Sequence, residues 1–384
     1  MAQLEQAFFD SVERFVRERI KPHVNDWDEA GEFPRELYAQ AAEIGLLSLG
    51  YPEQYGGVDC SLRDRLQLND IICGAGSGGL WAGLFSHNIG LPPIIAQGSA
   101  ELKERIVPPV LRGEKISALA ITEPGGGSDV ANLKTIAERK RDDKGEFFEV
   151  TGEKIFITSG VRADWLTVGV RTGEPGARGI SLLAIEGNSP GITRTNLRKM
   201  GWWMSDTASI HFDRVRVPVE NLIGTENKGF RAIMENFNNE RLMIAAGAIR
   251  FSQLCLDEAL DWSRNRKTFG QALVTHQAIR HKLMDMRMRI RGSRAWLMQI
   301  IHQLETGQLD EGLEGLVADI CLLKNQATQT MQFCSDQAVQ ILGGMGFMRG
   351  LVSERMYREV KVLMIGGGAE EIMKELAARQ LSVG

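Results

Sequence analysis

The chain has 384 residues, of which 43% are hydrophobic and 24% are charged. This length allows two or three domains, each large enough to bury a core of its own. With 45 basic and 49 acidic side chains the net charge is only −4, so no overall field attracts nucleic acid or an anionic membrane. We therefore expect a protein that binds neither.

The cysteines and histidines predict neither disulfides nor a metal site. Five cysteines are scattered without a CxxC pair, and six histidines show no HExxH or comparable spacing. The N-terminal stretch MAQLEQAFFDSVERFV carries acids among its apolar residues, unlike the core of a signal peptide, and no apolar stretch is long enough to span a bilayer. We expect a cytoplasmic protein without a metal.

The pattern of apolar residues divides the chain into three regions. Helical spacing dominates residues 1–118, which include the glycine-rich stretch GAGSGGLWAGLFSHN. Residues 119–225 contain short β-type runs such as FFEV, KIFIT and SIHF, separated by Gly, Asp, Asn and Pro, which predict a small antiparallel barrel or sandwich. Long helical periods return in residues 226–384 and predict a helical bundle. The fold class expected is α+β.

The stretch ALAITEPGGGSDVANLKT at 118–135 is the most informative motif. An apolar run ends at Thr122, and Pro124 with three glycines then forces a tight loop. The N–H groups and hydroxyls of such a loop can surround the polar edge of a cofactor. The same residues also suit a plain surface turn, so the loop alone leaves both interpretations open.

The whole string resembles the first signature of the acyl-CoA dehydrogenase family of flavoproteins. Three further stretches, KIFITSG at 154–160, RKTFGQALVTHQ at 266–277 and QILGGMGF at 340–347, resemble family motifs in the same order. The resemblance covers nearly the whole chain. It implies an N-terminal helical domain, a middle β-barrel domain and a C-terminal four-helix bundle. It also implies FAD between the last two domains, with the site completed by a second subunit of a homo-oligomer, a tetramer being favoured over a dimer.

The resemblance assigns cofactor contacts residue by residue. Two departures from the family pattern are small: Asn132 replaces the usual Gly, Ser or Ala, and Phe156 stands where Trp is common. Close helix packing is an alternative reason for the glycine pair near residue 343. The implied FAD contacts are Leu119, Thr122, Gly127, Ser128, Phe156, Thr158, Arg266, Thr268, Phe269, His276, Gln277, Gln340, Gly343, Gly344, Ala369 and Glu371.

A third departure is central, because it removes the usual catalytic base. Many family members have Tyr-Glu-Gly-Thr before the last helix, and the glutamate takes the α-proton of the substrate. This chain has Gly366, Gly367, Gly368 and Ala369 there. A minority branch, resembling long-chain and isovaleryl-CoA dehydrogenases, supplies the base from the first long helix of the C-terminal bundle. The matching stretch FNNERLMIAAGA makes Glu240 the candidate.

Helix geometry agrees with this assignment. Glu240 shares one helical face with Ile233, Phe237 and Ile244, so its carboxylate lies on the apolar stripe. A carboxylate in such a position is unfavourable unless it is paired or protonated. A pair with Arg241 is the alternative, but adjacent residues of a helix do not face one another. We expect desolvation to raise the pKa of Glu240 toward the range that a general base needs.

The implied reaction is α,β-dehydrogenation of an acyl-CoA thioester to the trans-2-enoyl-CoA. Glu240 takes the α-proton, the β-hydrogen leaves as hydride to flavin N5, and the N–H of Gly367 polarises the thioester carbonyl. An electron-transfer flavoprotein is the implied electron acceptor. The implied substrate contacts are Ser128, Asn238, Arg241, Gly366 and Gly367.

Two features suggest a wide acyl pocket. Gly366 removes the tyrosine wall that many relatives keep, and the small residues of 74–83 occupy a segment that lies along the acyl tail in the family. A short chain would leave apolar pocket surface unfilled, at about 0.8 kcal/mol for each methylene. We therefore expect medium, long or branched acyl groups.

Two other functions compete with this one. The first is a flavin-dependent monooxygenase or desulfinase on the same fold, because a fold does not fix the chemistry. The second is a non-catalytic, DNA-associated flavoprotein, suggested by the basic stretch RHKLMDMRMRIRGSR at 280–294. The alternative interpretation of this stretch is a helix that packs in the core. Its apolar stripe is then formed by Ile279, Leu283, Met286 and Ile290, and its arginines face solvent or a neighbouring subunit.

Overall fold

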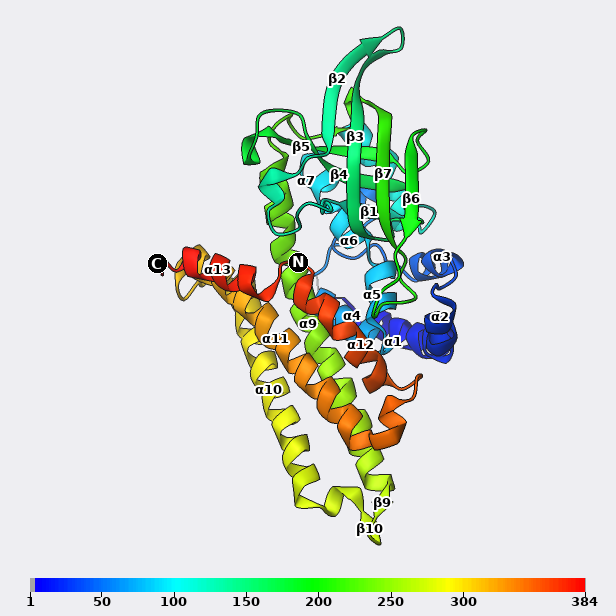
Figure 1. Ribbon diagram of the computed structural model, residues 1–384, viewed down its shortest axis with the longest axis vertical. Helices are drawn as coiled ribbons and strands as arrows, with labels where there is room; N and C mark the ends of the chain where they lie inside the picture. The colour runs from blue at the N-terminus through cyan, green and yellow to red at the C-terminus, as the bar shows by residue number, and fades with distance from the viewer. Residues whose placement is uncertain (1–3, 384) are drawn as a thin grey trace.

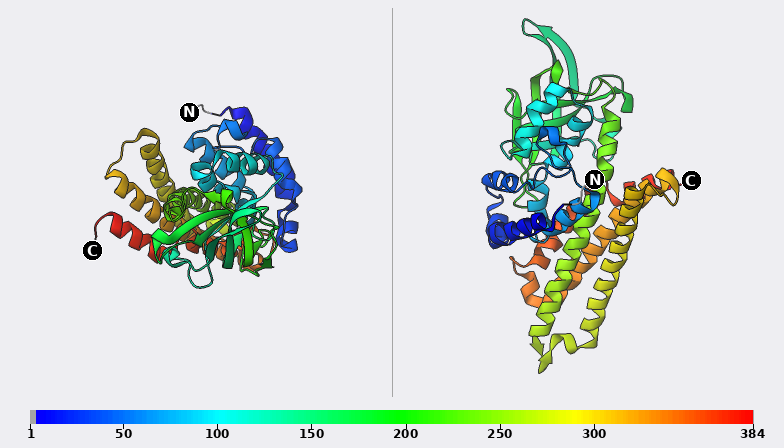
Figure 2. Two further views of the ribbon diagram at one scale, coloured as in Figure 1. Left: turned by 90° about the horizontal axis from the view of Figure 1, so that it is seen from above. Right: turned by 180° about the vertical axis from the view of Figure 1, so that it is seen from behind.

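The computed structural model describes residues 4–383, apart from the side chains of residues 235 and 236. Figure 1 shows a β domain at one end and a bundle of long helices at the other, with the N-terminal helices packed around their junction. The view from behind shows the same arrangement, with one long helix running from the β domain into the bundle (Figure 2). No helix among the described residues has the length and apolar character that crossing a membrane requires.

The N-terminal region is helical, as the apolar spacing predicts. In its first helix Phe9, Val12 and Phe15 form the buried face. Ser61 begins a later helix with a capping box, in which its hydroxyl accepts from the N–H of Asp64. The helices are α1 (Gln6–Phe15), α2 (Val24–Ala30), α3 (Glu36–Glu43), α4 (Leu62–Cys73), α5 (Gly78–Leu84), α6 (His87–Gly90), α7 (Pro92–Gln97) and α8 (Ala100–Leu111).

The middle region forms an eight-stranded sheet in the order β6-β7-β3-β2-β4-β5-β8, with β1 pairing β4. Most pairs are antiparallel, as the short alternating runs predict, but β1 and β2 each run parallel to β4. The strands are β1 (Ser117–Ala120), β2 (Ile136–Asp142), β3 (Gly145–Thr158), β4 (Trp165–Arg171), β5 (Ile180–Glu186), β6 (Ile192–Asn196), β7 (Thr207–Pro218) and β8 (Leu222–Ile223).

The C-terminal region is a bundle of long helices, in which a two-stranded hairpin connects α9 to α10. Helices α9, α10, α11 and α12 share one buried core, and α13 packs on α11. The α+β class and the helical, β-rich, helical domain order are confirmed. The elements are α9 (Gly229–Asn265), β9 (Lys267–Thr268), β10 (Gln271–Ala272), α10 (Gln277–Thr306), α11 (Gly312–Leu342), α12 (Val352–Ile365) and α13 (Glu370–Gln380).

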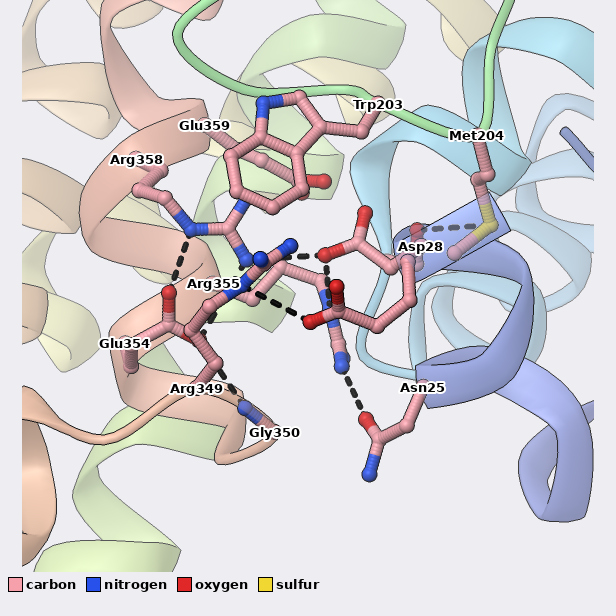
Figure 3. Close-up of polar contacts among 12 residues, drawn as sticks. Asn25, Asp28, Trp203, Met204, Arg349, Gly350, Glu354, Arg355, Arg358 and Glu359 are labelled. Carbon is pink, nitrogen blue, oxygen red and sulfur yellow. Dashed lines mark hydrogen bonds and ion pairs between the residues drawn. The ribbon is translucent and has the colours of Figure 1, made fainter. Parts of the chain in front are cut away.

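A buried polar cluster ties the three regions together around α12 (Figure 3). Asp28 of α2 receives Arg358 at 2.9 Å and Arg355 at 3.4 Å. The Arg358 guanidinium also lies 3.9 Å from the ring centroid of Trp203, in the loop before β7. Because α12 ends at Ile365, these contacts fix the helix from which the three-glycine loop leaves.

The glycine-rich segment at 74–83 is used for close packing. A Cβ on Gly78 would stand 2.5 Å from Trp202 Nε1, and one on Gly83 would stand 2.8 Å from the ring of Phe33. A Cβ on Gly79 would stand 3.0 Å from Cα of Trp202. The prediction that small residues of this segment widen a pocket is therefore wrong at these three glycines, because neighbouring side chains and backbone already occupy the space.

Candidate active site

Glu240 lies in the fourth turn of α9 on the face that packs into the molecule. Ile233 and Ile244 on the same face are almost fully buried, and Glu240 itself is partly buried. Among the described residues it makes neither an ion pair nor a hydrogen bond, and Arg241 next to it has other partners. The expected position of Glu240 on the apolar stripe is therefore observed.

Burial raises the pKa of Glu240 to about 7, and the positive charges of Arg241 and Lys324 oppose that rise. The cause is desolvation, which disfavours the ionised form of a carboxylate. A carboxyl group that titrates near neutral pH is able both to take up and to release a proton there.

The three-glycine loop passes directly beside this carboxylate. Gly367 has a φ of +67°. A Cβ on Gly367 would stand 2.9 Å from Cδ1 of Ile244 and 4.0 Å from Oε1 of Glu240. The loop thus adopts a backbone that favours glycine and occupies a site where a side chain would crowd α9.

Arg241 and Asn238, two of the predicted substrate contacts, join the loop to α9. Nε of Arg241 donates to the carbonyl of Gly367 at 2.9 Å, and its terminal nitrogen donates to Oδ1 of Asn238 at 2.9 Å. The structure therefore gathers Glu240, Asn238, Arg241 and Gly367 at one place. Gly366 adjoins them as the residue directly after α12.

Lys324 of α11 also holds the loop, and sequence reasoning missed it. Its side chain is fully buried, and Nζ donates to the carbonyls of Met364 at 2.8 Å and Gly368 at 2.7 Å. Burial lowers the pKa of Lys324 to about 8. A signal existed, because Lys324 shares the apolar helical face of Cys321 and Ala327.

A buried ion pair fixes the first cofactor loop and was likewise missed. Nζ of Lys154 lies 2.7 Å from Oε1 of Glu123, and Glu123 also accepts from the backbone N–H groups of Lys134 and Thr135. Both ends of the loop are thereby tied to one carboxylate. The signal was strand alternation, since Lys154 continues the inward face of Phe148 in β3.

The residues of this loop suit the polar parts of a flavin nucleotide. Ser128 and Gly127 are exposed, whereas Thr122 and Thr158 are partly buried. Phe156 is 66% exposed at a φ of +62°, next to a bulge between β3 and β7. An aromatic side chain held outward on a left-handed backbone is unfavourable in water, which fits a position that packs against a ring.

The β domain and α9 meet close to this loop. Leu119 of β1 is almost fully buried and belongs to the same apolar cluster as Ile121 and Ile233. Phe237 packs against that cluster one turn before Glu240. The first loop and the carboxylate therefore lie on neighbouring, directly packed elements.

A second set of predicted cofactor residues lies far from the first. The β9–β10 hairpin stands at the end of the bundle opposite the β domain (Figure 1). There Oγ1 of Thr268 lies 3.0 Å from Nε2 of His276, and Phe269 is 97% exposed. Arg266 precedes the hairpin and Gln277 follows it, both exposed. Within one chain these residues do not meet the loop at 121–135.

The glycine pair after α11 is not a packing device. Gly343 has a φ of +63°, and a Cβ on Gly343 or Gly344 would meet no atom within 4 Å. The alternative of close helix packing is thus wrong, because open space surrounds both residues. Gln340 lies in the last turn of α11 and is exposed, which leaves this end of the bundle open for contact.

The remaining two predicted contacts lie where α13 begins. Ala369 is the N-cap of α13 and Glu371 is an exposed residue of its first turn. The free N–H groups of a helix N-terminus suit a polar ligand.

Comparison with known proteins identifies the fold and the chemistry. Family models described as the N-terminal, middle and C-terminal domains of acyl-CoA dehydrogenase match residues 3–114, 118–215 and 227–382. The chain belongs to the acyl-CoA dehydrogenase family. Its activity is that of the family, a flavoprotein oxidoreductase acting on a CH–CH bond of an acyl-CoA, and members of the family bind FAD.

Individual relatives match over almost the entire chain. Acyl-CoA dehydrogenase AFT10-1 of Alternaria alternata is 36% identical over 97% of this chain and 90% of its own length. The mitochondrial long-chain specific acyl-CoA dehydrogenase of Mus musculus is 34% identical over 97% and 85%. A solved acyl-CoA dehydrogenase structure from Geobacillus kaustophilus is 32% identical with a TM-score of 0.91, covering 98% of both chains. The prediction of an acyl-CoA dehydrogenase is confirmed.

Proposed function

We propose that the protein performs FAD-dependent α,β-dehydrogenation of medium-chain, long-chain or branched acyl-CoA, with Glu240 as the base. In this respect it resembles the long-chain and isovaleryl-CoA dehydrogenase branch. The observation that carries the proposal is the 4.0 Å distance between Oε1 of Glu240 and the Cβ position of Gly367. A carboxylate from α9 thus reaches the loop in which many family members carry their glutamate.

The side chains and backbone have distinct roles in this reaction. The ionised carboxylate of Glu240 accepts the proton from the α-carbon of the thioester. The N–H of Gly367 donates to the thioester carbonyl, which stabilises the charge that develops on its oxygen as the proton leaves. Arg241 holds the Gly367 carbonyl on the other side of the loop. Bound FAD supplies the two-electron acceptor for the hydrogen that leaves the β-carbon.

The preference for medium-chain, long-chain or branched acyl groups rests on Gly366 and on the long-chain specific relative at 34% identity. Gly366 presents no side chain at the end of α12, in the loop that borders Glu240. Each additional methylene that the pocket buries contributes about 0.8 kcal/mol, or about fourfold in kcat/KM.

A complete FAD site would need two copies of the chain. Ser128, between β1 and β2, and Phe156, in β3, belong to the β domain, whereas Arg266 directly precedes β9. Figure 1 shows the β9–β10 hairpin at the far end of the bundle. Three exposed methionines on α10 support a subunit interface on this helix, because a group of exposed apolar side chains is typical of a surface that contacts another protein. They are Met284, Met288 and Met298. A homotetramer is favoured over a dimer.

The electron acceptor and compartment complete the proposal. A solved structure described as the electron transferring flavoprotein of Acidaminococcus fermentans is 28% identical with a TM-score of 0.90. An electron-transfer flavoprotein is the acceptor that we propose, in the cytoplasm.

Anaerobic flavin bleaching tests the proposal. The FAD-loaded protein is mixed with butyryl-, octanoyl- and palmitoyl-CoA and with a β-branched acyl-CoA, and kcat/KM is compared. We expect rapid bleaching and a preference of at least about tenfold for the longer or branched chains over butyryl-CoA, the result of two or more further buried methylenes. Fastest reduction by butyryl-CoA would contradict the acyl-chain proposal, and no bleaching by any acyl-CoA would contradict the reaction itself.

A further inference from the structure

The three-glycine loop is held from behind by two cations on two helices. Lys324 of α11 donates to the carbonyls of Met364 and Gly368, and Arg241 of α9 donates to the carbonyl of Gly367. Gly367 and Gly368 both have positive φ values, +67° and +117°, so the path of the loop depends on these donors and on the absence of side chains.

These hydrogen bonds decide which way the loop presents its N–H groups. The N–H and C=O of one peptide unit point in opposite directions. Since the carbonyls of Gly367 and Gly368 point at Arg241 and Lys324, the N–H groups of Gly368 and Ala369 point away from those cations. Lys324 hydrogen-bonds to one residue before Gly367 and to one residue after it. It thereby orients the backbone on both sides of the glycine that lies beside Glu240.

Lys324 differs from the other fully buried lysine for which the structure gives contacts. Lys154 is neutralised by Glu123 at 2.7 Å, whereas the described partners of Lys324 are backbone carbonyls. Its charge is therefore not cancelled by a carboxylate in direct contact. A buried ammonium without a counter-ion is unfavourable, and a methionine of similar length would fill the same space at lower cost.

The charge of Lys324 acts on Glu240 across the loop. Burial has the largest effect on the pKa of Glu240 and raises it, whereas the charges of Arg241 and, to a smaller extent, Lys324 lower it. Lys324 in turn faces Glu370 of α13, Arg241, Glu240 and Cys321. Nε2 of Gln329, also on α11, donates to Oε1 of Glu370 at 2.8 Å, so this carboxylate oxygen is hydrogen-bonded to a residue other than Lys324.

We propose that Lys324 is a positioning residue for the dehydrogenation, one that fixes the backbone from Met364 to Gly368 against the Glu240 carboxylate and places a positive charge behind that backbone. This inference rests on the proposed role of Glu240 as the base. The described hydrogen bonds of Lys324 go to backbone carbonyls and not to Glu240, so Lys324 acts through the loop and through its charge.

The test measures the protonation of Glu240 without requiring turnover. The carboxylic-acid C=O infrared band that disappears in Glu240→Gln reports this group, and its intensity is followed against pH. In Lys324→Met the loss of a neighbouring cation should raise the midpoint by roughly one pH unit. Lys324→Arg, which keeps the charge, should stay near the wild-type midpoint. Lys144→Met, which removes an exposed lysine from the turn between β2 and β3, should leave the midpoint unchanged.

The pH profile of anaerobic flavin reduction should move in the same direction. If Lys324→Met does not fold, Lys324→Gln takes its place, because it retains an N–H donor and lacks the charge. An unchanged midpoint in the neutral variant, or an equal shift in Lys324→Arg, would overturn the proposal and leave Lys324 a purely structural residue. Failure of the function itself gives a different result, namely a wild-type protein that no acyl-CoA reduces while the infrared band still titrates.

Discussion

Glu240 and Gly367 approach each other across the junction of α9 and the loop before α13, with Oε1 of Glu240 4.0 Å from the Cβ position of Gly367. A carboxylate on residue 240 of α9 and a carboxylate on residue 367 of the loop would therefore lie in the same part of the site. In the mechanism that we propose, this chain uses the carboxylate of the helix and leaves the loop as glycine. Because Cδ1 of Ile244 lies only 2.9 Å from that Cβ position, the helix side chains have taken over the space of a loop side chain.

This relationship predicts that the carboxylate can be moved. Gly367→Glu in a Glu240→Gln background returns an acid to the loop, and Ile244→Val removes the methyl group that would clash with it. We expect the triple variant to reduce its flavin at least about tenfold faster than the variant without Gly367→Glu. This gain is part of the rate enhancement that a positioned base provides. Glu240→Gln with Ile244→Val alone is the matched control. Equal rates in the two variants would show that the positions do not face the same atom.

The rate of flavin reduction should depend on pH through Glu240. As the proposed base, Glu240 works in its ionised form, and burial raises its pKa to about 7. Single-turnover reduction by a good acyl-CoA should therefore be slow near pH 5.5, half-maximal close to pH 7, and level above about pH 8. A rate that is flat or that falls over this range would be incompatible with Glu240 as the titrating group.

The same carboxylate should limit stability. Its pKa in the folded protein, about 7, exceeds the ordinary value of 4.5, so the folded state holds the proton more tightly than the unfolded state. The free energy of unfolding therefore contains a contribution that is present below pH 4.5 and is lost as pH rises through 7.

Glu240→Gln removes this dependence. It should match the wild type near pH 4.5 and be more stable by at most about 3 kcal/mol at pH 8. Urea unfolding at both pH values measures the difference. A variant equally stable or less stable at pH 8 would contradict the raised pKa.

The buried pair of Glu123 and Lys154 should matter for the first cofactor loop. Glu123→Gln leaves the Lys154 ammonium buried without its counter-ion, which typically costs about 3 to 5 kcal/mol. Denaturant unfolding should show this loss, and FAD should dissociate faster because the loop at 121–135 is released. Adding Lys154→Met should restore much of the stability. A loss below about 1 kcal/mol in the single variant would mean that the pair is not essential to the loop.

The sequence was sufficient for the fold class and for the location of Glu240. Apolar spacing placed Glu240 on the stripe of Ile233 and Ile244, and burial of that stripe is what the structure shows. Both results follow from local periodicity. The class of the enzyme came from motifs whose residues lie near one another in sequence.

Contacts between distant segments could not be predicted in this way. Lys324 is one lysine in a long helix, and its partners are backbone carbonyls 40 and 44 residues away, in the last turn of α12 and in the three-glycine loop. The glycines at 78 and 83 have packing partners, Trp202 and Phe33, that only the folded chain brings together. Small residues in a sequence therefore indicate either an open pocket or a tight contact, and tertiary structure decides which.

The most direct test of the account is the rate of anaerobic flavin reduction in Glu240→Gln. The amide keeps the shape of the side chain and cannot accept a proton, so reduction by acyl-CoA should fall by about 10²- to 10⁴-fold while the FAD content stays at the wild-type level. A wild-type rate in the FAD-loaded variant would exclude Glu240 as the base.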